Sequence, residues 1–92
     1  MSFKNKMYLH VGNNRIIREK DIIGIFDTDS STLSSPITKK YLSDAEKSGR
    51  VEMAGDDIPK SFIVYRDPRK KETRICFSVL STAALIGRIS EE

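Results

Sequence analysis

The residues best suited to bind a charged partner lie close together in the last third of the chain. Residues 66–74 contain five basic and two acidic side chains, which give this segment a local charge of +3. The basic side chains are Arg66, Arg69, Lys70, Lys71 and Arg74. On a projecting hairpin such side chains can bind phosphates, and arginines can also reach base edges. Charged hairpin tips are commonly just solvated. The segment therefore has two interpretations, a nucleic-acid contact or a solvated turn.

A second basic set is formed by Lys39 and Lys40. These lysines follow Ser35-Pro36, a pair typical of a helix start, with serine as the N-cap and proline at the first helical position. The free N–H groups at a helix N-terminus favour anions, so these lysines are further candidates for phosphate contact.

Two carboxylates near the end of an apolar stretch are the most suggestive candidates for catalysis. Residues 22–26 are apolar, and Asp27-Thr28-Asp29 follows. This order resembles the first motif of haloacid-dehalogenase-type phosphatases, where the first aspartate is the nucleophile, the second a general acid, and magnesium holds the phosphate. Those enzymes need a larger doubly wound sheet than 92 residues of this pattern can supply. We therefore expect Asp27 and Asp29 to be turn residues, with the phosphatase as a distant third hypothesis.

The remaining reactive side chains do not form a recognisable catalytic or metal-binding pattern. The sequence has one Cys and one His. A single cysteine cannot form an internal disulfide, and one Cys with one His cannot supply the four ligands of a structural zinc site. Cys76 lies in an apolar stretch, where burial should make it inert. The pair Asp56-Asp57 precedes Pro59 in a segment typical of a solvated loop. We expect no catalytic residue, no metal site and no cofactor.

Size and composition limit the class of protein. A chain of 92 residues with 38% hydrophobic and 32% charged side chains forms one domain with a small core. Additional burial through oligomerisation would suit such a composition. Apolar runs reach only about five residues, far below the roughly twenty that a membrane span needs, so we expect a cytoplasmic protein without membrane contact.

Lys4 and Lys6 precede Met7, and residues 1–6 are expected to be a disordered leader before a domain over 7–90.

The pattern of apolar and turn residues predicts a single α+β domain. We expect strands over residues 8–11, 15–18, 21–26, 50–53, 60–66 and 73–79, and helices that begin at Pro36 and at Ala83. Residues 27–35 are expected to be a loop, and Ile37, Tyr41, Leu42 and Ala45 the apolar face of the first helix. The order is β-β-β-α-β-β-β-α, with a small mixed or antiparallel sheet.

The order of these segments resembles a known family of bacterial regulators. Residues 8–12 and 20–27 resemble the start of RemB-type regulators, which belong with the RemA-type regulators of the extracellular matrix in biofilms. Residues 35–40 are similar to the Ala-Pro-Ile-Lys-Arg helix start of the RemA branch, and residues 62–64 and 80–81 fall where that branch has paired strands and a final turn. The resemblance implies a small α+β protein that binds DNA, forms symmetric oligomers such as rings, and activates matrix genes.

One segment departs from the family pattern. Where the RemA branch has an arginine-rich loop used for DNA, residues 55–60 read Gly-Asp-Asp-Ile-Pro-Lys, and only Lys60 is positive. The acidic pair would repel phosphate, so DNA contact would have to move to the residues named above together with Lys60. The leading hypothesis is therefore a DNA-associated regulator acting as a homo-oligomer. The alternative is a protein-interaction or scaffold module of the same fold without direct DNA binding.

Overall fold

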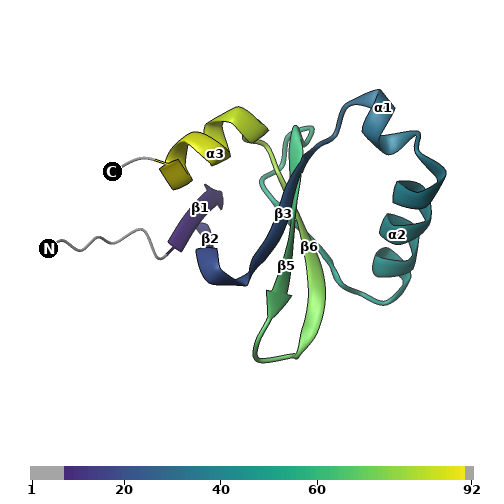
Figure 1. Cartoon of the computed structure of the whole chain (residues 1–92), viewed down its shortest axis with the longest axis horizontal. Coiled ribbons are helices and arrows are strands. Elements are labelled where there is room, and N and C mark those ends of the chain that lie inside the picture. Colours follow the sequence, from purple (N-terminus) through teal and green to yellow (C-terminus); the bar gives the residue numbers. More distant parts are fainter. Residues whose placement is uncertain (1–7, 91–92) are drawn as a thin grey trace, which may run out of the picture.

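The computed structural model describes residues 8–90, so the predicted leader over residues 1–6 lies outside the described residues. The described chain is arranged in layers (Figure 1). A four-stranded sheet lies in the middle, a two-stranded hairpin and one helix lie on one side of it, and the other helices lie on the opposite side. The predicted α+β class is confirmed, and within the described part of the chain the strands form two sheets rather than one.

The central sheet contains the most apolar strands. Its order is β3 (Ile22–Asp27), β5 (Ser61–Asp67), β6 (Glu72–Ser78) and β4 (Val51–Ala54). All neighbours are antiparallel except β4 and β6, which are parallel. The middle strands β5 and β6 are rich in β-branched and aromatic residues, which suit a surface buried on both faces.

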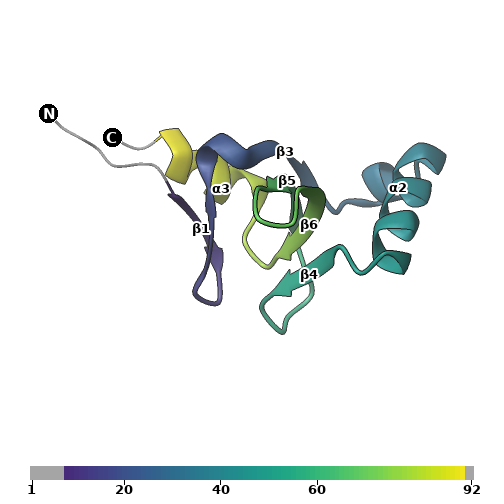
Figure 2. The same ribbon diagram turned by 90° about the horizontal axis from the view of Figure 1, so that it is seen from below.

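A separate hairpin packs against one face of this sheet. It consists of β1 (Tyr8–Gly12) and β2 (Arg15–Arg18), paired antiparallel. Both turn residues, Asn13 and Asn14, have positive φ angles, of 52° and 62°. Asparagine tolerates this conformation, which matches the twist of a two-residue hairpin. The 3-10 turn Glu19–Asp21 then leads into β3. Figure 2 shows the hairpin beside the sheet rather than within it.

The helices begin where the sequence supplies caps. Helix α2 (Pro36–Lys47) starts at the predicted position, and the Ser35 hydroxyl accepts a hydrogen bond from the N–H of Thr38. Helix α3 (Thr82–Ser90) is capped by Ser81, whose Oγ accepts from the N–H of Ala84 at 3.1 Å. The prediction of a loop over residues 27–35 is wrong in one part, because Ser30–Leu33 forms the short helix α1. Asp29 stabilises that turn, since its Oδ1 accepts from the N–H of Thr32 at 2.8 Å.

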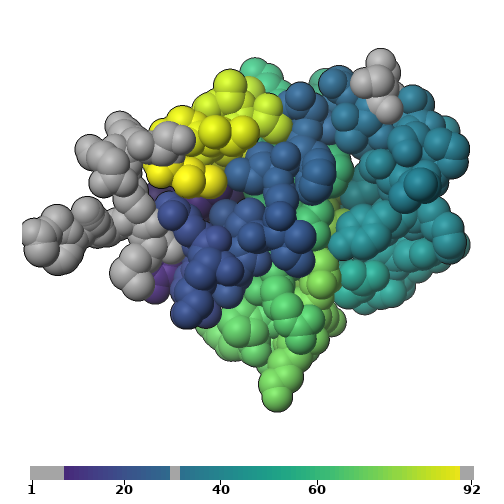
Figure 3. All heavy atoms as spheres, in the orientation of Figure 1, coloured from purple at the N-terminus to yellow at the C-terminus, as the bar shows by residue number. Residues whose placement is uncertain are grey.

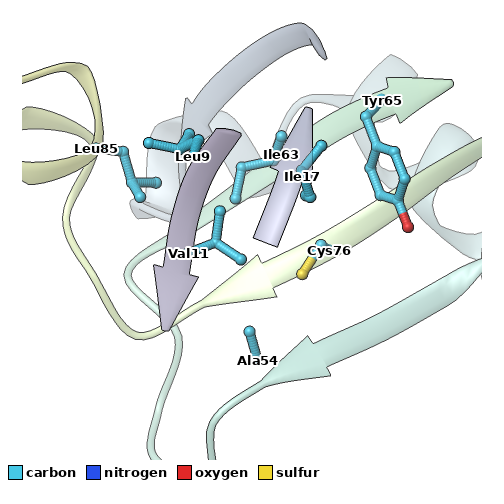
Figure 4. Packing of buried hydrophobic residues seen from close by; sticks show 8 residues of the cluster. All are labelled: Leu9, Val11, Ile17, Ala54, Ile63, Tyr65, Cys76 and Leu85. Atoms are coloured by element: carbon cyan, nitrogen blue, oxygen red, sulfur yellow. The ribbon is translucent and has the colours of Figure 1, made fainter. Parts of the chain in front are cut away.

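Each face of the central sheet has its own apolar cluster. The first cluster joins the hairpin, the sheet and α3, and Figure 4 shows its side chains pointing into the space between these elements. Its buried members are Leu9, Val11, Ile17, Ala54, Ile63, Tyr65, Cys76 and Leu85. The second cluster lies under α2 and contains Ala45, Phe62, Val64 and Ile75. The core is therefore small and divided by the sheet.

The predicted apolar face of α2 is only partly buried. Ala45 is fully buried and Leu42 packs against the second cluster, whereas Ile37 is 82% exposed and Tyr41 40% exposed. The reason is that α2 packs on β4 and β6. The apolar side chains in the first half of this helix, which face β3, are therefore left uncovered.

No helix among residues 8–90 is long and apolar enough to cross a membrane.

The buried hydroxyl of Ser78 ties the hairpin to the sheet, and its removal should destabilise the fold. Ser78 Oγ donates to the carbonyl of Val11 at 2.6 Å and accepts from the N–H of Leu80 at 3.0 Å. Ser78→Ala removes this partner from both backbone groups, of which the Val11 carbonyl is buried and the Leu80 N–H partly buried, so we expect a loss of about 1–3 kcal/mol in the free energy of unfolding. Urea denaturation would measure it. Ser43→Ala on the exposed side of α2 is the control, with an expected change within about 0.5 kcal/mol; equal midpoints for both variants would contradict the prediction.

Candidate functional site

A groove of about 650 Å³ lies between the β1–β2 hairpin and the tip of the β5–β6 hairpin. Four basic side chains line it, two from each hairpin: Arg15, Arg18, Arg69 and Lys70. Two carboxylates, those of Asp21 and Asp67, also line it, so the lining carries a net charge of +2. The aromatic rings of Tyr8 and Tyr65 complete the wall. This groove brings charged and aromatic side chains from both hairpins together, and we take it as the candidate site.

The β1–β2 wall is held in place by ion pairs. Arg15 Nε donates to Glu52 Oε1 at 2.7 Å, and its Nη2 donates to the Tyr65 hydroxyl at 2.6 Å. The guanidinium also lies 5.5 Å from the centre of the Tyr65 ring. The hydrogen bond to Glu52 raises the pKa of Arg15. The charge of Arg15 is thus largely balanced, and the residue fixes the wall more than it offers a free cation.

Arg18 lies further along β2 and is paired more loosely. Its Nε donates to Asp21 Oδ2 at 3.0 Å, and 39% of its side chain remains exposed. A surface pair of this kind contributes little to stability, because water screens both charges. An incoming phosphate could therefore share Arg18 with Asp21 at little cost.

The opposite wall contains the cations that are most available. Asp67 ends β5, and its Oδ1 accepts from the backbone N–H groups of Arg69 at 2.9 Å and Lys70 at 3.3 Å. Desolvation alone would raise the pKa of Asp67, but these backbone N–H groups lower it. The carboxylate therefore orders the turn, while the side chains of Arg69 and Lys70 extend into solvent. None of the ion pairs formed within residues 8–90 includes either of them.

Arg74, the fifth member of the predicted basic cluster, is largely buried and forms ion pairs within the fold. Its side chain is only 12% exposed and pairs with Glu52 at 3.2 Å and Glu72 at 2.5 Å. Glu52 also accepts a short hydrogen bond from the Tyr65 hydroxyl. Partial burial would raise the pKa of Glu52, yet the hydrogen bonds from Arg15 and Tyr65 outweigh it and the pKa is lowered. Burial and the neighbouring Glu52 raise the pKa of Tyr65 to about 12.

The structure does not bring the other predicted phosphate-binding residues into the groove. Lys39 and Lys40 are on α2, across the sheet, where Lys40 pairs with Asp44 at 3.0 Å. Lys60 directly precedes β5, and the tip of the β5–β6 hairpin follows this strand. Lys60 and the tip are therefore separated by the length of a seven-residue strand, about 20 Å. Arg66 follows Tyr65 in β5, and alternation places it on the α2 face. Lys71 lies at the tip beside the groove, with a φ angle of 55°.

The carboxylates considered for catalysis have structural partners. Asp27 Oδ1 accepts a hydrogen bond from the Thr82 hydroxyl at 2.7 Å, and Asp29 caps α1. No group of three His, Cys, Asp or Glu side chains within residues 8–90 is placed to hold a metal ion. Cys76 is buried, and this desolvation together with Glu52 raises the pKa of its thiol to about 12. Asp56 and Asp57 lie exposed in the β4–β5 loop.

Arg15 and Arg18 are the site residues that sequence reasoning missed. The signal was present in part, because Asn13-Asn14 predicts a tight hairpin and thereby places Arg15 and Arg18 on the same strand. What the sequence does not contain is the docking of this hairpin beside the β5–β6 tip. Only that contact makes the two basic pairs face one groove.

Comparison with known proteins identifies a relative that is similar over nearly the whole chain. The chain is 33% identical over 82 residues to a protein of Bacillus subtilis (strain 168) named extracellular matrix regulatory protein B. The aligned region covers 89% of this chain and 89% of the relative, so the similarity includes nearly the whole of both proteins. No model of a protein family matches the sequence.

The ion pairs around Glu52 should make stability depend on pH. Because the pKa of Glu52 is lowered in the folded protein from an ordinary value of 4.5, its contribution is complete above that pH and is lost as the pH falls through the folded-state pKa. Glu52→Gln should therefore reduce the free energy of unfolding by about 1.5–3 kcal/mol at pH 7, with the difference from the wild type shrinking below about pH 4.5. Urea midpoints between pH 3 and 7 measure this.

Glu46→Gln, on the exposed side of α2, removes the same charge outside this network. It is expected to change the free energy of unfolding by less than about 0.5 kcal/mol at pH 7. A constant difference between wild type and Glu52→Gln over the whole pH range would show that the carboxylate charge contributes nothing.

Proposed function

Because the chain belongs to the family of extracellular matrix regulatory protein B, we propose that it regulates production of the extracellular matrix in biofilms by associating with DNA as a homo-oligomer. The family supports the regulatory role. The observation that supports DNA as the partner is the groove in which Arg15 and Arg18 face Arg69 and Lys70. In this proposal the protein is a regulator rather than an enzyme.

Each basic residue has a distinct part in this proposal. Arg69 and Lys70 carry the charges that displace counterions from the phosphate backbone, since they are exposed at the hairpin tip. Lys71 adds a further charge beside them. Arg18 is shared between Asp21 and a phosphate, and Arg15 keeps the wall in position. Contacts of this type position a protein on DNA without reading its sequence.

An oligomer is part of the proposal because a single copy offers few contacts. Two or three phosphates per copy would give weak and strongly salt-dependent binding. Several copies joined in one assembly would bind a duplex at several points, and the second and later contacts form at a high effective concentration. The exposed pair Asp56-Asp57 would repel phosphate, so the β4–β5 loop should face away from the DNA in such an assembly.

The DNA proposal is tested by removing charge from the groove. Arg69→Ala/Lys70→Ala should weaken binding to a mixed-sequence duplex about tenfold at low salt. It should also reduce the slope of log K against log salt by about 1.8, since each phosphate contact contributes about 0.9. Fluorescence anisotropy at several salt concentrations measures both quantities, and light scattering checks that the oligomeric state is unchanged.

Lys47→Ala/Lys60→Ala is the matched control, because it removes two exposed positive charges outside the groove. Its slope should equal that of the wild type. An equal loss in both variants would mean that only net charge matters and that the groove is not the site. A wild-type oligomer that ignores the duplex at low salt would transfer the regulatory role to a protein partner without direct DNA binding.

A further inference from the structure

A second hollow, apolar rather than basic, lies on the opposite face of the sheet. It has a volume of about 320 Å³ and lies between β3 and the first half of α2. Its walls are Ile23 and Phe26 on one side and Ile37 and Tyr41 on the other, with Phe62 and Val64 beneath. In Figure 3 it lies between the blue surface of β3 and the teal surface of α2.

The walls of this hollow are more exposed than a folded monomer requires. Ile23 is 63% exposed, Phe26 43% and Ile37 82%. Large apolar side chains gathered in one concave patch are typical of an interaction surface, whereas scattered ones are not. A partner that covers them would need an apolar group of matching size.

The same chain presents such a group on the β4–β5 loop. Ile58 is 83% exposed and does not line the hollow of its own chain. Figure 2 shows the tip of this loop projecting beyond β4. Because Ile58 is exposed and does not line the hollow of its own chain, it is available to another copy.

The loop is held in a defined shape on both sides of Ile58. Gly55 has a φ angle of 129°, and a Cβ there would lie 2.9 Å from a methyl group of Val79, so glycine is required. The Asp57 carboxylate accepts the N–H of Ile58 at 3.3 Å, and the hydroxyl of Thr28 donates to the carbonyl of Pro59 at 2.8 Å. A preordered loop loses little conformational entropy on binding, which favours docking.

Charges beside the two apolar surfaces are complementary. Asp56 and Asp57 precede Ile58 directly. Lys39 follows the hollow-lining Thr38 on α2, and Arg66 lies on the same face of β5 as Val64. Neither Lys39 nor Arg66 belongs to an ion pair formed within residues 8–90. A second copy would therefore bring two carboxylates to two available cations.

We propose that this hollow is filled by a second copy of the chain, with Ile58 of one copy inserted between β3 and α2 of the next and its acidic neighbours facing Lys39 and Arg66. The inference rests on the homo-oligomer of the proposed function and identifies its contact. The two surfaces differ, so the contact is head-to-tail and extends to a ring or a chain of copies. None of the residues of this contact lines the basic groove.

The contact is tested by placing a charge on either side of it. Ile58→Asp and Ile37→Asp each put a carboxylate into the apolar contact, and both positions are exposed, so the monomer should fold normally. Without DNA, light scattering should show a shift from oligomer to monomer, with an apparent dissociation constant raised at least tenfold. Ile86→Asp, at a position of α3 that is 51% exposed, is the matched control and should keep the wild-type mass.

Mixing the two variants identifies the geometry. Ile58→Asp retains an intact hollow and Ile37→Asp an intact loop, so an equimolar mixture should form a complex of two chains and nothing larger. Variants that keep the mass of a wild-type oligomer would overturn the inference alone. A monomeric wild type would overturn both the inference and the homo-oligomer of the proposed function. Association with DNA fails separately, on duplex binding by the wild type.

Discussion

The packing of the β1–β2 hairpin against the central sheet is the contact on which the rest of the structure depends. A two-stranded hairpin is marginal by itself in water, so it is ordered here by burial of Leu9, Val11 and Ile17. Each such side chain contributes about 1.5–3 kcal/mol when it leaves water. The same packing closes the first apolar cluster over Cys76 and, with Leu85 of α3, forms half of a small core. It also creates the basic groove, because one wall belongs to the hairpin and the other to the sheet.

Polar contacts give this packing its register. Glu52 on β4 receives hydrogen bonds from Arg15 on β2, Tyr65 on β5 and Arg74 on β6, so one carboxylate connects strands of both sheets. The hydroxyl of Ser78 bonds the carbonyl of Val11 in the buried region beside them. Apolar burial favours contact between hairpin and sheet in many orientations, whereas these directional bonds suit one.

The central sheet separates two kinds of surface. Side chains of β5 alternate between its faces, so Tyr65 belongs to the basic groove while Val64 and Arg66 belong to the side of the apolar hollow. Basic residues that are neighbours in the sequence are therefore separated in the structure. The pleat places some of them on the opposite face of the sheet, the length of β5 keeps others apart, and internal ion pairs hold the rest. Arg74 is the clearest example, because its charge is used to balance Glu52 and Glu72. No residue lines both the basic groove and the apolar hollow.

The sequence by itself determined the elements of this protein. Caps at Ser35 and Ser81, the Asn13-Asn14 turn and the alternation of apolar residues in β5 and β6 act locally, and local signals are readable without the fold. The order of strands and helices and the α+β class follow from them and are confirmed. The family resemblance rests instead on the likeness of whole segments to a known family, and the relative at 33% identity confirms it. The short helix α1 was missed because its cap, Asp29, also suits a loop. Only the tertiary structure decided which charges remain available and which apolar side chains stay exposed. Arg15 meets Glu52 across 37 positions of sequence, and Ile37 stays uncovered because α2 leans toward β4 and β6 rather than β3. Both results depend on contacts between distant segments, and no local pattern encodes them.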